Sequence, residues 1–66
     1  MLTIKVDCEE GDNLITVFDQ CKELAKTFHL RVQTEFNGKI CIITPDGNYQ
    51  KFRRKFNTID MNPVIE

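Results

Sequence analysis

The 66-residue sequence contains none of the short motifs that identify a cofactor or a reaction. It has no P-loop, no G-x-G-x-x-G and no zinc-finger spacing, so nucleotide and zinc sites of those kinds are not expected. No apolar run approaches the roughly 18 residues that a transmembrane helix needs. The first residues lack a charged leader followed by an apolar stretch. We therefore expect no signal peptide and a cytoplasmic location.

Cysteine is present in an odd number and without a C-x-x-C pair, whereas a small secreted scaffold normally has an even, denser set. Cys21 falls on the apolar side of a predicted helix and Cys41 inside a predicted strand, where a thiol packs as a small hydrophobic side chain. Cys8, Cys21, Cys41 and the single His29 show no ligand-pair spacing. No nucleophile is paired with a base. We predict buried thiols, no metal, no cofactor and no enzymatic activity.

The net charge of −1 predicts neither a nucleic-acid nor a membrane partner for the whole molecule. A local acidic run precedes the first predicted helix, but its spacing does not match a calcium loop, so we interpret it as a solvated turn. Its members are Asp7, Glu9, Glu10 and Asp12.

Hydrophobic periodicity predicts a single α+β domain over residues 1–57, followed by a C-terminal tail over residues 58–66. Seven apolar side chains at three- and four-residue steps indicate a long amphipathic helix, which either Asp12 or Asn13 caps. The Asn37-Gly38 pair between two strand-like runs predicts a hairpin. The expected elements are a strand at residues 2–6, a helix at 14–28, strands at 31–36 and 40–43, and a short helix within 48–57. We expect a β-α-β-β-α domain with a three-stranded sheet in the order 2-3-1 and the long helix on one face.

The second hairpin strand is apolar on both faces, which is the most informative feature of the sequence. A two-residue turn would direct Cys41 and Ile43 into the core and leave Ile40 and Ile42 on the outer face. A three-residue loop with Gly38 in the left-handed conformation would reverse the two pairs. In either register an apolar pair faces away from the long helix. It could be covered by the aromatic side chains of the short C-terminal helix, by a second copy of the chain or by another protein.

A basic cluster occupies the short C-terminal helix, on the same segment as Tyr49, Phe52 and Phe56. Such a cluster suits nucleic-acid phosphates and an acidic protein surface equally well. The four cations are Lys51, Arg53, Arg54 and Lys55.

Several segments resemble small uncharacterised accessory proteins encoded by bacteriophages and prophages. They are Glu23-Leu24-Ala25-Lys26, the run from Val32 through Glu35-Phe36-Asn37-Gly38, and the turn at Pro45. The resemblance implies a protein of the bacterial host cytoplasm that binds, and often blocks, a host factor.

We therefore expect a non-enzymatic, phage-type accessory protein that binds another protein and could inhibit a host defence or housekeeping factor. A separate hypothesis is a stand-alone homodimer with no other partner. The alternative is a small nucleic-acid-binding module that uses the basic helix. The residues expected to contact a partner are Ile40, Ile42, Lys51, Arg53, Arg54 and Lys55.

Overall fold

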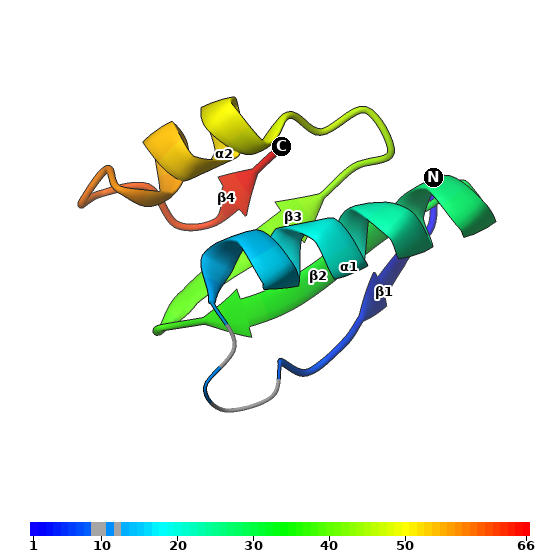
Figure 1. Cartoon of the computed structure of the whole chain (residues 1–66), viewed down its shortest axis with the longest axis horizontal. Helices are drawn as coiled ribbons and strands as arrows, with labels where there is room; N and C mark the ends of the chain where they lie inside the picture. The colour runs from blue at the N-terminus through cyan, green and yellow to red at the C-terminus, as the bar shows by residue number, and fades with distance from the viewer. Residues whose placement is uncertain (9–10, 12) are drawn as a thin grey trace.

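The computed structural model describes residues 1–8, 11 and 13–66 and shows two helices beside one mixed β-sheet (Figure 1). The α+β class expected from the periodicity is confirmed. In chain order the elements are β1 (Thr3–Lys5), α1 (Leu14–Phe28), β2 (Arg31–Phe36), β3 (Lys39–Ile43), α2 (Tyr49–Phe56) and β4 (Val64–Ile65).

The long helix α1 begins at Asn13, whose side-chain oxygen accepts hydrogen bonds from the backbone N–H of Thr16 at 3.1 Å and from its hydroxyl at 2.6 Å. This satisfies one of the free N–H groups of the first turn. Asp12, the other expected cap, lies outside the described residues. The helix ends at His29, which adopts the left-handed conformation with φ 53° and donates its N–H to the carbonyl of Ala25. The apolar stripe buries Val17, Phe18, Cys21 and Ala25.

The sheet has four strands in the order β1-β2-β3-β4, so the expected three-stranded sheet in the order 2-3-1 is wrong. β1 lies parallel to β2, with Ile4 beside Val32, instead of next to β3. The carbonyl of Leu2 accepts the N–H of Arg31 at 2.8 Å, and the N–H of Val6 donates to Gln33 at 2.8 Å. These long-range bonds fix the strand order, and no local pattern encodes them.

The other neighbour of β3 is β4, which lies within residues 58–66, the segment expected as a tail. Val64 is fully buried, and the N–H of Glu66 donates to the carbonyl of Ile42 at 2.9 Å. Because β4 has only two residues, it shows no period-2 pattern from which a strand could have been predicted.

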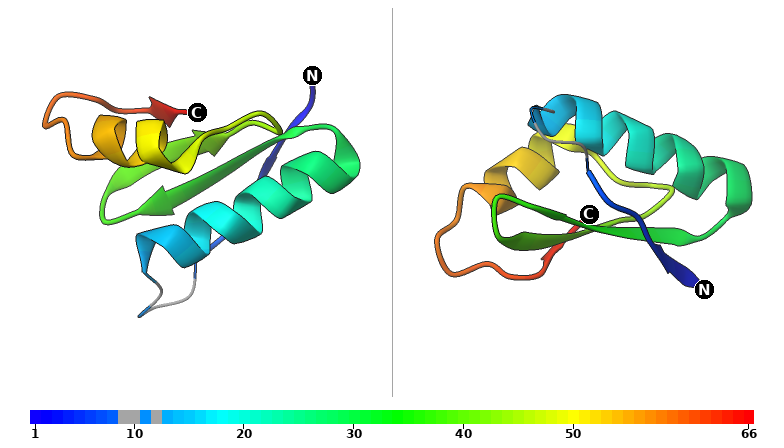
Figure 2. Two further views of the ribbon diagram at one scale, coloured as in Figure 1. Left: turned by 45° about the horizontal axis from the view of Figure 1, so that its top comes forward. Right: turned by 90° about the horizontal axis from the view of Figure 1, so that it is seen from below.

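Both helices cover the same face of the sheet (Figure 2). The helix expected within residues 48–57 is confirmed as α2, which Asn48 caps by accepting the N–H of Lys51 at 3.1 Å. Phe52 is fully buried, with its ring centroid 5.0 Å from that of Phe18 in α1.

At the C-terminal end of α2, the Lys39 ammonium of β3 donates to the carbonyls of Phe56 and Thr58. The positive charge of Lys39 in this position interacts favourably with the negative end of the helix dipole.

Candidate functional site

The hairpin adopts the two-residue turn. Phe36 pairs with Lys39, and Asn37 and Gly38 have φ values of 50° and 79°. Positive φ at both central residues is typical of a type I′ turn, whose backbone twist matches the twist of the flanking strands. The three-residue alternative is therefore wrong. The pairing directs Cys41 and Ile43 into the core, where both are fully buried.

Ile40 and Ile42 consequently lie on the face of the sheet opposite to the helices, which we call the outer face. Ile40 is 37% exposed and Ile42 is half-buried. β4 adds a third apolar side chain, because Ile65 pairs with Ile42 and is 47% exposed. We call Ile40, Ile42 and Ile65 the isoleucine stripe. Ile65 was not predicted as a site residue, since only the pairing of β4 places it there.

The rest of the outer face is polar and belongs to β1 and β2. Lys5, Gln33 and Glu35 line a shallow hollow of about 320 Å³, which Asp7 and Ile40 also border. Arg31 lies on the same face at the start of β2 and is exposed, as is Glu35 near its end. The surface thus combines an apolar half with a half that carries charges of both signs.

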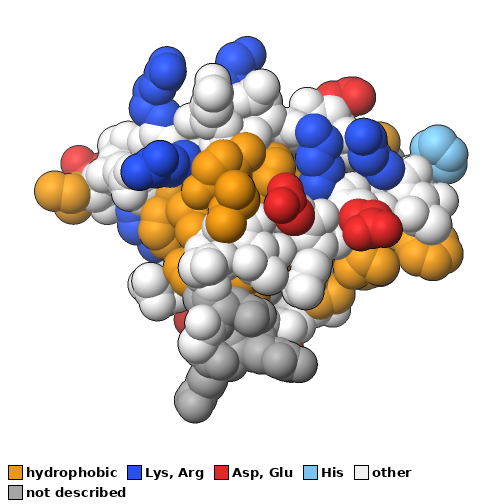
Figure 3. Space-filling model, in the orientation of Figure 1, with side chains coloured by type: hydrophobic (Ala, Val, Ile, Leu, Met, Phe, Trp, Pro, Cys, Tyr) orange, Lys and Arg blue, Asp and Glu red, His pale blue; other side chains and the backbone are white. Residues whose placement is uncertain are grey.

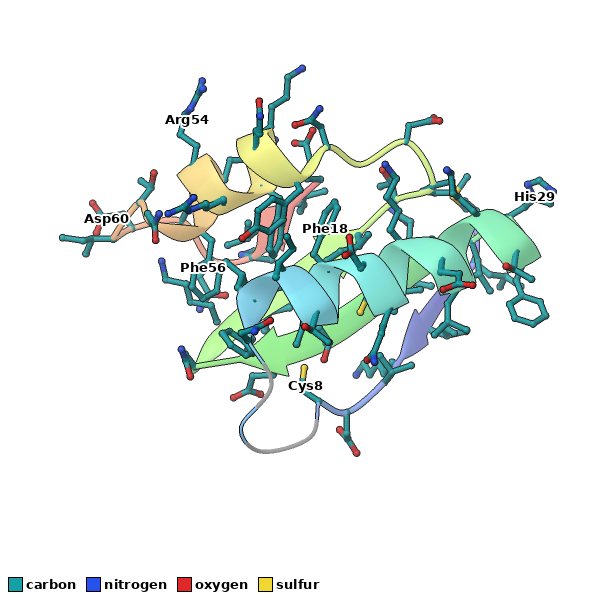
Figure 4. All side chains as sticks on the ribbon, in the orientation of Figure 1. Cys8, Phe18, His29, Arg54, Phe56 and Asp60 are labelled. Carbon is teal, nitrogen blue, oxygen red and sulfur yellow. The ribbon has the colours of Figure 1, made fainter. Side chains whose placement is uncertain are left out.

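The aromatic side chains of α2 do not cover the isoleucine stripe. Tyr49 and Phe52 contact Phe18, with ring centroids at 5.4 Å and 5.0 Å, and Phe56 contacts Phe36 at 5.8 Å. Phe18 is buried, and Figure 4 shows it between α1 and α2. Among the described elements, neither helix lies on the outer face (Figure 2). Cover by α2, one of the three arrangements considered, is therefore wrong.

The basic cluster is divided by a contact with the C-terminal strand. The Lys55 ammonium lies 2.6 Å from a carboxylate oxygen of Glu66 and donates to the carbonyl of Ile65 at 2.9 Å. Its hydrogen bond holds the pKa of the Glu66 carboxyl below its ordinary value. Burial, the second-largest effect, opposes this shift, whereas the charge of Lys55, the backbone N–H of Asn48 and the charge of Lys51 add to it. The charge of Lys55 is thus neutralised within the chain.

The remaining cations Lys51, Arg53 and Arg54 are exposed on α2. Figure 4 shows Arg54 directed away from the body of the molecule, and Figure 3 shows blue side chains along one edge of the helix-covered face. Ile40 and Ile42 lie on the opposite face of the sheet. The structure therefore does not bring the two sets of expected partner-binding residues into one surface.

The thiols lie in and beside the core. Cys21 and Cys41 are buried, and burial raises the pKa of each to about 11, with a further contribution from nearby Cys8. Cys8 is half-buried, with its sulfur 2.9 Å from the hydroxyl oxygen of Thr34. It borders a cavity of about 140 Å³ beneath α1, together with Cys21 and apolar side chains of the helix. A raised thiol pKa disfavours the nucleophilic thiolate, so Cys21 and Cys41 are suited to packing.

Within residues 1–8, 11 and 13–66, no group of three or more His, Cys, Asp or Glu side chains is placed to hold a metal ion. His29 is exposed and points away from the molecule (Figure 4). Of the acidic run, Asp7 is exposed, and Glu9, Glu10 and Asp12 lie outside the described residues.

Comparison of the chain with models of protein families, with curated proteins and with solved structures finds no match. In the part of the chain that the structure describes, no helix is long and apolar enough to cross a membrane.

Proposed function

We propose that this protein is a non-enzymatic protein-binding domain whose outer sheet face docks on another protein. The observation that carries the proposal is the isoleucine stripe, Ile40, Ile42 and Ile65, on a face that neither helix covers. Single exposed apolar side chains are ordinary, but neighbouring ones on adjacent strands form a contiguous patch, which typically marks an interaction site.

The composition of the outer face supports this function. Protein interfaces have an apolar centre and a polar rim that excludes water and fixes orientation. On this face the isoleucine stripe would supply the centre, and Arg31, Gln33 and Glu35 would supply part of the rim. Burial of apolar surface contributes about 25 cal/mol per Å², so loss of one isoleucine contact is expected to weaken a complex measurably.

The finer part of the proposal rests on the resemblance of Glu23-Leu24-Ala25-Lys26 and of the hairpin to phage-encoded accessory proteins. On that basis the partner is a bacterial host factor in the cytoplasm, and binding inhibits it.

Glutamate substitutions on the stripe test the proposal. We expect Ile40→Glu and Ile65→Glu to abolish capture of a partner from bacterial lysate and binding of that partner once purified. Ile15→Glu is the matched control, because Ile15 is 48% exposed and lies on α1, away from the outer face. Capture that survives both stripe substitutions in proteins with a wild-type circular dichroism spectrum would contradict the proposal.

The alternative function, nucleic-acid binding by α2, is favoured by the exposure of Lys51, Arg53 and Arg54 on one helix. Each phosphate contact would make the affinity fall steeply with salt. The double substitution Arg53→Ala/Arg54→Ala would then abolish binding to a generic duplex and to a single strand. Lys5→Ala is the control, because Lys5 is exposed on the outer face, on the opposite side of the sheet from α2. Absence of salt-dependent binding by the wild-type protein would eliminate this alternative.

A further inference from the structure

A row of four side chains crosses the outer face, one from each strand. The register aligns Lys5 with Gln33 of β2. It then aligns Gln33 with Ile42, and Ile42 with Ile65. A two-fold axis lying in the plane of the face along this row would place each member against the same residue of a second copy. The apolar end of the row would then meet an identical apolar end.

The charges of β2 are arranged symmetrically about the same row. Arg31 lies two residues before Gln33 and Glu35 two residues after it, and both are exposed on the outer face. Each is about 7 Å from the row along the strand, given a rise of about 3.3 Å per residue. The same axis therefore brings Arg31 of one copy over Glu35 of the second copy, and it does so twice.

We propose that the outer face binds a second copy of this chain, face to face and with the two β2 strands antiparallel. Ile42 and Ile65 would meet their counterparts, and two Arg31–Glu35 pairs would lie at the two ends. Such an interface is isologous and closes at two copies. The inference rests on the proposed function, since it uses the same protein-binding surface, and a second copy would compete there with a different protein.

The polar end of the row is compatible with this arrangement. Lys5 would approach Lys5 of the second copy at the rim, where water screens the repulsion. Asp7 lies two residues further along and borders the same hollow. The long side chain of Lys5 can therefore reach diagonally toward Asp7 of the second copy.

The outer face is large enough for a stable dimer. Figure 2 shows the helices and the sheet as two layers, so the outer face is one of the broad sides of a molecule measuring 30 × 23 × 17 Å. A standard interface buries about 800 Å² on each partner. That area is about a sixth of the 4678 Å² surface of this chain.

The decisive experiment is charge exchange between two variants, followed by sedimentation equilibrium over a range of protein concentrations. We expect a dimer for the wild-type chain. Arg31→Glu and Glu35→Arg each place like charges at both ends of the interface. The dimer dissociation constant of each variant alone should therefore rise by about tenfold or more. An equimolar mixture of the two variants restores opposite charges and should dimerise like the wild type. Arg54→Glu, which changes the net charge as Arg31→Glu does but on α2, should leave dimerisation unchanged.

Two results would overturn the inference. One is a wild-type chain that stays monomeric up to millimolar concentration. The other is a dimer whose affinity neither charge variant changes, which would place the contact on another surface. Both are distinguishable from failure of the proposed function, because Ile40→Glu separately tests binding of another protein. A monomer that binds a purified partner and loses it on Ile40→Glu would exclude the second copy and retain the protein-binding face.

Discussion

The Lys55 ammonium lies 2.6 Å from the Glu66 carboxylate and thereby joins helix α2 to the end of strand β4. The threonine hydroxyl of Thr44 donates to the backbone carbonyl of Glu66 at 2.6 Å, which ties the same end to the turn after β3. These contacts hold a two-residue strand in the sheet. Together with the pairing of β4 with β3 and the burial of Val64, they keep Ile65 on the outer face.

The Lys55–Glu66 pair makes the stability of the fold dependent on pH. The folded-state pKa of Glu66 is lowered, so its contribution is present above the ordinary carboxyl value of 4.5 and is lost as the pH falls through the folded-state value. We expect Glu66→Gln to lower the free energy of unfolding at pH 7 and to make progressively less difference below pH 4.5. Urea unfolding between pH 3 and pH 7 measures the free energy of unfolding of the wild-type protein and of the Glu66→Gln variant. Glu23→Gln removes the same charge from the exposed side of α1 and serves as the control; an equal pH-dependent loss in that variant would contradict the prediction.

Gly47 is required by the close approach of β4. A Cβ at this position would lie 2.5 Å from the carbonyl oxygen of Glu66 and 3.2 Å from that of Thr44. Both neighbours are backbone atoms, so relief requires the chain to move. We expect Gly47→Ala to destabilise the fold by about 1–3 kcal/mol in urea unfolding, as overpacking typically does. The neighbouring Asp46→Ala, at an exposed residue, should change stability by less than about 0.5 kcal/mol. Equal stability of the two variants would show that β4 is not held as closely as described.

The three thiols should react at very different rates. At pH 8 a thiol with a pKa of about 11 is ionised in only about one molecule in a thousand, and burial also shields Cys21 and Cys41 from reagent. Cys8 is only half-buried and borders the cavity beneath α1. We expect one thiol to be alkylated rapidly in the folded protein and two only on unfolding, as followed by mass spectrometry. Cys8→Ser should remove the rapid phase; rapid labelling of Cys41 in that variant would contradict the described burial.

The aromatic contact between the two helices should carry much of the stability. Phe18 is 1% exposed and contacts both Tyr49 and Phe52. Phe18→Ala is expected to cost about 3–5 kcal/mol, because it removes buried surface and leaves a cavity. That is comparable to the whole stability of a chain of this size, so the variant should be largely unfolded at 25 °C by circular dichroism. Phe28→Ala, at a side chain 62% exposed, should remain folded.

The elements with local signals can be predicted from the sequence alone. The apolar stripe and the Asn13 cap specify α1, Asn48 specifies the start of α2, and Asn37-Gly38 specifies the hairpin. Side-chain alternation then fixes that Ile40 and Ile42 face away from the core, once the two-residue turn sets the register.

How these elements pack together depends on contacts between segments that are distant in the sequence. β1 joins β2 and β4 joins β3 through long-range backbone hydrogen bonds, and every non-proline residue carries the same backbone groups. The burial of Phe52 against Phe18 placed α2 on the face already covered by α1, which separates the basic cluster from the isoleucine stripe. The pairing of β4 with β3 added Ile65 to the isoleucine stripe. The local sequence of β3 therefore encodes only part of the candidate surface, namely Ile40 and Ile42. The extent of the surface also depends on β4, the distant strand that pairs with β3 and supplies Ile65.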